Sequence, residues 1–131
     1  MIYLDSSAVL KLVHDEWESA ALAEWLTVRA GTPVVSSEIA KVEVIRSCRR
    51  VDADALPSAR AVLAGLDLIP LSGDLLDEAA DVGGTMLRSL DAVHLASALS
   101  IREHLEAFVA YDHRLAEAAS AAGFECVQPG A

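Results

Sequence analysis

The chain has 131 residues, 53% of them hydrophobic and 5% aromatic, and its formal net charge is −10. This length predicts one domain over residues 1–131, and the apolar content suffices for a sizeable core. The acidic excess argues against nonspecific nucleic-acid binding through a general basic surface. No apolar run approaches the ~20 residues that span a bilayer, and the N-terminus lacks the pattern of a secretory signal. We therefore expect a cytoplasmic protein.

Short apolar runs alternate with helical stripes along the chain. Strands are expected at 1–4, 34–35, 66–71, 108–111 and 124–127. Helices are expected at 6–13, at 17–30 and at 114–122. Three further helices are expected to start at candidate caps: at 36 or 37 and running to 50, at 52 or 54 and running to 65, and at 89 and running through 99. Another is expected from 72 or 74 to 88, with a break at 83–84. No tight hairpin signal joins the strands, so crossover connections and a parallel sheet follow. Helices then cover both faces of the sheet in an α/β fold, and residues 127–131 form a mobile tail.

Four carboxylates lie against these apolar elements, at Asp5, Glu43, Asp91 and Asp112. Asp5 and Asp112 close strands, Asp91 lies in the first turn of a helix, and Glu43 lies about two turns into another. Ligands of open α/β sheets bind beyond the carboxyl ends of the strands, where the two strand-end acids point. Two carboxylates 4 Å apart repel by about 4 kcal/mol at an effective dielectric near 20. Several converging acids therefore need a cation, shared protons or separate partners.

A divalent cation would give such a site a chemistry. Mg²⁺ and Mn²⁺ take oxygen ligands, lower the pKa of a bound water and support phosphodiester hydrolysis with one or two metals. The alternative is local: Asp5 and Asp112 could be helix N-caps, and Asp91 a favourable first-turn charge. Glu43 gains nothing from capping, although it could pair with Arg46. The joint pattern favours the metal site.

The motifs around these acids resemble the PIN-domain ribonucleases, specifically the VapC-type toxins of type II (VapBC) toxin–antitoxin pairs. The matching segments are Tyr3-Leu4-Asp5-Ser6-Ser7-Ala8, Ser36-Ser37 through Val42-Glu43-Val44, Arg88-Ser89-Leu90-Asp91-Ala92-Val93-His94-Leu95-Ala96 and Tyr111-Asp112-His113-Arg114-Leu115. Their order and spacing cover essentially the whole chain, and the segment from Arg88 to Ala96 is the most specific.

The resemblance implies a single PIN domain, a three-layer α/β/α sandwich with a central, mostly parallel sheet of about five strands. It implies an endoribonuclease dependent on Mg²⁺ or Mn²⁺, with Asp5, Glu43, Asp91 and Asp112 as the catalytic, metal-binding quartet and Ser6 supporting it. It also implies a homodimer that is neutralised by a VapB-type antitoxin in a heterotetramer or larger assembly. One departure is Ala110, where relatives often carry Thr; the missing hydroxyl is expected to loosen the surroundings of Asp112.

Other residues have two interpretations each. Arg88 is a candidate RNA contact or a helix-end charge near Asp81 or Glu78. Arg46 is a second candidate RNA contact, although the cluster of Arg46, Arg49 and Arg50 also suits a solvated helix end. His94 is expected to be a hydrogen-bonded structural residue rather than a metal ligand. Trp17 and Trp25 could pack in the core or form part of a protein interface, and core packing is the default expectation.

Two further functions compete with the nuclease. A catalytically weak PIN fold could act mainly as a protein-binding module. A phosphohydrolase or receiver domain also places Asp at strand ends, but Ser6 and Ser7 stand where those patterns need a further acid. The sequence does not distinguish among transfer, ribosomal and messenger RNA as the substrate.

Overall fold

A single five-stranded sheet forms the centre of the protein in a computed structural model that describes residues 1–131. All neighbouring strands are parallel, in the order β3-β2-β1-β4-β5. The strands are β1 (Ile2–Leu4), β2 (Val34–Ser37), β3 (Asp67–Ile69), β4 (Ala107–Val109) and β5 (Cys126–Val127). The expected mostly parallel sheet is therefore confirmed.

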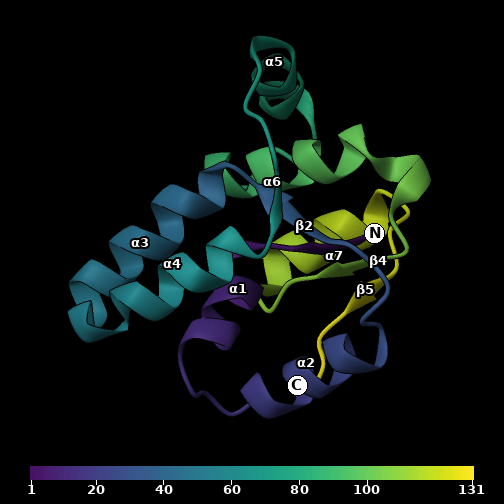
Figure 1. The fold of residues 1–131 in the computed structure, drawn as a ribbon. Helices are drawn as coiled ribbons and strands as arrows, with labels where there is room; N and C mark the ends of the chain where they lie inside the picture. The colour runs from purple at the N-terminus through teal and green to yellow at the C-terminus, as the bar shows by residue number, and fades with distance from the viewer.

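Seven α-helices and two short 3₁₀ helices connect the strands (Figure 1). The α-helices are α1 (Ser6–Val13), α2 (Ser19–Val28), α3 (Ile39–Val51), α4 (Leu56–Ala64), α5 (Gly73–Asp81), α6 (Ser89–Ser100) and α7 (His113–Ala121). The 3₁₀ helices are η1 (Ala53–Ala55) and η2 (Arg102–His104). No helix is long and apolar enough to cross a membrane.

Two hydrophobic cores lie on opposite faces of the sheet, which gives the three-layer α/β/α arrangement. Side chains of successive strand residues point to opposite faces, and β1 shows this alternation. Ile2 and Leu4 pack with residues of α1 to α4, whereas Tyr3 packs with residues of α6 and α7. Helix α5 lies outside these layers and packs on α6 through Leu75 and Ala79 (Figure 1).

The structure corrects two expectations about the segment before α6. The helix that begins at Gly73 ends at Asp81 and does not resume before Arg88. Gly83 adopts a φ of 73°, and a Cβ at this position would lie 2.7 Å from Cδ2 of Leu87, so the chain turns sharply here. Ser89 is the first residue of α6 rather than its cap, because Arg88 is the extended residue that precedes the helix.

Trp17 is also placed differently from expectation. The residue is 89% exposed. It precedes the first residue of α2 and therefore does not lie on the buried face of that helix. Trp25 is partly buried against the core, and the guanidinium of Arg29 lies 4.0 Å from the centroid of its ring. After β5, the Gln128 side chain donates to the carbonyl of Ala110, and the mobility of residues 127–131 stays a prediction.

Candidate functional site

The order of the strands creates a crevice where β1 lies beside β4. From β1 the chain builds the sheet outward through β2 and β3, and it then returns to the other side of β1 to place β4. Such a topological switch point is the usual ligand-binding position of an open parallel sheet. Asp5 follows β1 and Asp112 follows β4, so both acids lie at this edge. The amide of Asp5 donates to the carbonyl of Val109 over 3.1 Å, which ties the two strand ends together.

Asp5 is a buried carboxylate with one oxygen fully engaged. Its residue is only 3% exposed, and Oδ1 accepts from the Ser7 hydroxyl at 2.6 Å and from the Ala8 amide at 2.9 Å. The second bond makes Asp5 the N-cap of α1. Ser7 also accepts from the amide of Tyr111, which links the start of α1 to the segment after β4. Oδ2 makes no hydrogen bond and is the oxygen left for a ligand.

Glu43 reaches the same edge from α3 and is held by two donors. Oε1 accepts from the Ser6 hydroxyl and lies 2.7 Å from Nε2 of His94. A carboxylate can only accept, so Nε2 of His94 carries the hydrogen of this bond. The hydroxyl of Tyr3 lies 2.7 Å from the other ring nitrogen, and both Tyr3 and His94 are fully buried. A buried chain of hydrogen bonds thus runs from β1 through α6 to Glu43.

Asp91 connects the four acids electrostatically. Burial raises its pKa, and the charges of Asp112 and Glu43 raise it further, against the lowering effects of His94 and Arg88. Burial raises the pKa of Asp5 to about 6, and the charge of Asp91 adds to this effect. Each of the other three acids therefore lies within electrostatic range of Asp91.

Glu43 behaves in the opposite way. Burial alone would raise its pKa, but the hydrogen bond and charge of His94, with the Ser6 hydroxyl, outweigh burial and lower it. The pKa of Glu43 thus lies below its ordinary value, whereas the pKa values of Asp5 and Asp91 lie above theirs. Such a divergence of pKa values among neighbouring carboxylates is typical of functional sites.

Asp112 is the N-cap of α7, because its Oδ1 accepts from the amide of Leu115 at 3.1 Å. Its neighbour Ala110 is buried, with 1% of its surface exposed. The capping interpretation of Asp5 and Asp112 thus holds for one oxygen of each, and the electrostatic grouping holds as well. A cap uses a single carboxylate oxygen, so the two interpretations are compatible.

The residue types suit a hard divalent cation, since the available donors are carboxylate and hydroxyl oxygens. The side chains do not converge as in a formed metal centre: no group of three or more His, Cys, Asp or Glu is placed to hold an ion. The mutual repulsion around Asp91 is the observation that favours a cation between them. Coordination by the quartet stays a prediction.

The sequence did not predict which side chains hold the four acids in place. The expectation of a hydrogen-bonded structural His94 agrees with its contacts, but neither its partner Glu43 nor Tyr3 was foreseen. Ser7 was also missed, because its hydroxyl joins Asp5 to the amide of Tyr111, 104 residues later in the chain, and no local pattern signals that contact. The charge of Arg88 lowers the pKa of Asp91, whereas Arg46 is exposed on α3 and has no such effect on the acids.

Comparisons with known proteins agree on one family. The PIN domain family model matches residues 2–121. Ribonuclease VapC47 of Mycobacterium tuberculosis is 41% identical over 134 residues, covering 100% of this chain and 98% of that protein. Ribonuclease VapC35 of the same species is 42% identical over 132 residues, covering 99% and 98% of the two chains.

Two solved structures share the fold. The crystal structure of Mycobacterium tuberculosis VapC20, a sarcin-ricin loop cleaving toxin, has a TM-score of 0.73 at 21% identity and covers 98% of this chain and 100% of its own. The structure of VapBC2 from Rickettsia felis, bound to a promoter DNA fragment, has a TM-score of 0.72 at 11% identity, with coverages of 98% and 99%. At 21% and 11% identity, these two structures show that the chain shares their fold, and no more than the fold.

The raised pKa of Asp5 predicts how stability depends on pH in metal-free protein. With a pKa of about 6 when folded and 3.8 ordinarily, the folded state holds the proton more tightly. The resulting stabilisation is complete below the unfolded pKa and is lost as the pH rises through 6. In urea titrations with a chelator, the stability of Asp5→Asn relative to the natural protein should grow by about 2 kcal/mol from about pH 4 to about pH 7.5. A difference that does not change with pH would contradict the buried, proton-holding Asp5.

Replacement of His94 tests the buried hydrogen-bond chain. His94→Leu removes the bonds of the ring to the Tyr3 hydroxyl and to Glu43 and should lower the free energy of unfolding by about 1–3 kcal/mol. The matched control is Ser100→Ala, further along the same helix, whose hydroxyl donates to the carbonyl of Ser97 and takes no part in the chain from Tyr3 to Glu43. Equal losses in the two variants, measured by urea unfolding, would show that the chain adds nothing to stability.

Proposed function

Because this chain belongs to the PIN-domain family of VapC ribonucleases, we propose that it is a divalent-metal-dependent endoribonuclease that acts as the toxin of a toxin–antitoxin pair. The proposal rests chiefly on one observation, the repulsion that Asp91 exerts on Asp5 and shares with Glu43 and Asp112 at the switch point of the sheet. Full-length relatives that are named ribonucleases support the same activity.

We propose that Asp5, Glu43, Asp91 and Asp112 hold Mg²⁺ or Mn²⁺. When bound, the ion supplies an acidified water and charge stabilisation for hydrolysis of an RNA phosphodiester. Three of the four acids already use one oxygen within the fold. Asp5 and Asp112 each use Oδ1 to cap a helix, which leaves Oδ2 available to the ion. Glu43 has its Oε1 engaged by Ser6 and His94, so Oε2 is the oxygen available to the ion.

Arg88 and Arg46 have proposed roles outside the acidic quartet. Arg88 precedes α6 and lowers the pKa of Asp91, so its guanidinium is near enough to contact a phosphate at the site. Arg46 lies one turn after Glu43 on α3 and would contact a phosphate of the RNA farther from the acids. Neither side chain is paired with a carboxylate.

The family also supports proposals about partners and location. We propose a VapB-type antitoxin as the inhibitor, a homodimer of this chain, a heterotetramer or larger complex with the antitoxin, and a cytoplasmic location. The net charge of −10 suits a basic inhibitory segment. Activity must therefore be assayed with protein that has been separated from any antitoxin.

The test of the proposed activity is cleavage of total cellular RNA with Mg²⁺, with Mn²⁺ and with a chelator. Discrete fragments should require the metal, and Asp91→Asn should lower the rate by about 100-fold or more, since even residues that only support metal ligands account for 10–100-fold. Asp74→Asn, which removes an exposed acid from the first turn of α5, is the charge-matched control and should cleave normally.

Two results would contradict that activity. Fragments that persist with the chelator or in Asp91→Asn would assign the cleavage to another enzyme. No cleavage by folded, antitoxin-free protein would favour the protein-binding module instead. If cleavage is observed, mapping of the fragment ends identifies the RNA and the bond.

Metal binding should also be visible without any RNA. A ligand that binds only the folded state stabilises it by about 2.7 kcal/mol at 100 times its dissociation constant. Mn²⁺ should therefore raise the melting temperature of the natural protein near neutral pH, and Asp91→Asn should remove most of the increase. A melting temperature that Mn²⁺ leaves unchanged would exclude the proposed ion site even if cleavage were detected.

A further inference from the structure

The cations of this acidic protein are concentrated on two helices. Of its ten Lys and Arg residues, five lie on α3 and α4, and the only acid in these two helices is Glu43. The rest of the chain therefore holds five basic and 19 acidic residues. The five cations are Lys41, Arg46, Arg49, Arg50 and Arg60, here called the α3–α4 basic face.

The side chains of the basic face are free to bind a ligand. All five residues are exposed, and none forms an ion pair. Cations elsewhere are largely engaged. Lys11 pairs with acids of the segment before α2, and Arg102 donates to the carbonyl of Ala122 and lies over the ring of Phe124. Arg29 donates to the carbonyl of Trp25, so three of the five cations outside the basic face have a fixed partner.

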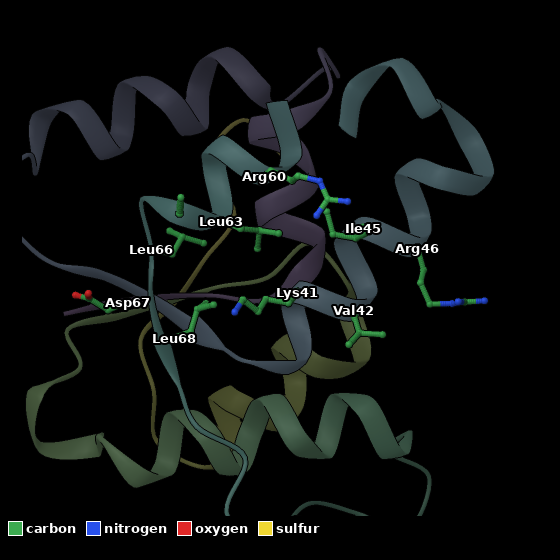
Figure 2. A pocket seen from close by; sticks show the side chains of 10 residues that line it. Lys41, Val42, Ile45, Arg46, Arg60, Leu63, Leu66, Asp67 and Leu68 are labelled. Atoms are coloured by element: carbon green, nitrogen blue, oxygen red, sulfur yellow. The ribbon is translucent and has the colours of Figure 1, made fainter. Parts of the chain in front are cut away.

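Two hollows adjoin the basic face. One, of about 320 Å³, is lined by Arg46, Arg49 and Arg50 alone. The other is a groove of about 890 Å³ with an apolar floor between α3, α4 and β3, where Lys41 and Arg60 lie together with Asp67. Figure 2 shows Lys41 and Arg60 beside this groove; Arg46 also lines it, and its guanidinium points outward from α3.

Helix stability does not account for the whole pattern. Arg49 and Arg50 lie in the last turn of α3, where cations suit the helix dipole. Lys41 lies in the first turn of the same helix, where a cation is unfavourable, and Arg60 lies in the interior of α4. A ligand that is negative along its length explains all five positions.

We propose that the α3–α4 basic face binds the phosphate backbone of single-stranded RNA and guides it to the carboxylate site. The proposal rests on the proposed nuclease function, and α3 supplies the link because it also carries Glu43. Arg46 is one turn and Arg50 two turns beyond Glu43, so the face extends about 10 Å along the helix from the site. Guanidinium groups bind phosphate oxygens through paired hydrogen bonds, and the hollow between the three arginines offers them no competing acid.

The salt dependence of RNA binding tests this proposal. A fluorescent oligouridylate of about 20 nucleotides exceeds the usual site size of single-strand binders, and a chelator prevents cleavage during the titration. Each lost phosphate contact on a single strand should reduce the slope of log affinity against log salt by about 0.7. Arg50→Gln should therefore lower the slope by about 0.7, and Arg49→Gln with Arg50→Gln by about 1.4, with weaker binding at low salt.

The matched control is Arg29→Gln, which changes the net charge equally at the end of α2, where Arg29 lies over the Trp25 ring. It should leave the slope unchanged. Slopes that fall equally in Arg29→Gln and Arg50→Gln, slopes that change in neither, or no binding by the natural protein would overturn the proposal. Unchanged RNA binding would direct attention to an acidic protein as the occupant.

The two proposals can fail separately. RNA that binds with the predicted slopes but is never cleaved would support RNA binding by the basic face and contradict the nuclease proposal. Metal-dependent cleavage with unaltered slopes in the arginine variants would support the nuclease proposal and contradict RNA binding by the basic face.

Discussion

Repulsion among carboxylates at the switch point is the constraint on which the rest of this structure depends. Three of the four acids lie within electrostatic range of Asp91, in a region from which Asp5 has lost nearly all contact with solvent. Folding without a cation therefore leaves charge close to charge, or protons on groups that are normally ionised. The protein reduces this repulsion with helix amides, hydroxyl donors and one histidine, each of which engages a single carboxylate oxygen.

These local contacts also explain why the two sides of the sheet act together. Tyr3 points into the core beneath α6 and α7, whereas its neighbours Ile2 and Leu4 point toward α1 to α4. Its hydroxyl reaches His94 on α6, which reaches Glu43 on α3. Helices from both layers are thus joined at the carboxyl edge of the sheet by polar contacts as well as by apolar packing. Displacement of either layer would move a carboxylate of the candidate site.

Much of the fold was predictable because the signals are local. Alternating strands and helices without hairpin turns predicted the parallel sheet, and strand-end acids predicted where a site would lie. The break at Gly83 was seen, but the end of the helix was not, because the turn depends on a close approach to Leu87. Trp17 was misplaced because periodicity alone does not tell which end of a stripe leaves the core. The partner of His94 lies 51 residues away, and no local pattern encodes such a contact.

The pairing of the sheet also sets an order in which the site can form. Ile2 of β1 pairs with Val34 of β2, but its other neighbour is Ala107 of β4, 105 residues later in the chain. Contacts of such high sequence separation form late, since a long loop must close before they contribute. During synthesis on the ribosome, a growing chain can assemble β1, β2 and β3 with the helices between them while the crevice beside β1 is still open. The carboxylate site is complete only when β4 and Asp112 have been made, so the nascent protein is without its full acidic quartet for most of its translation.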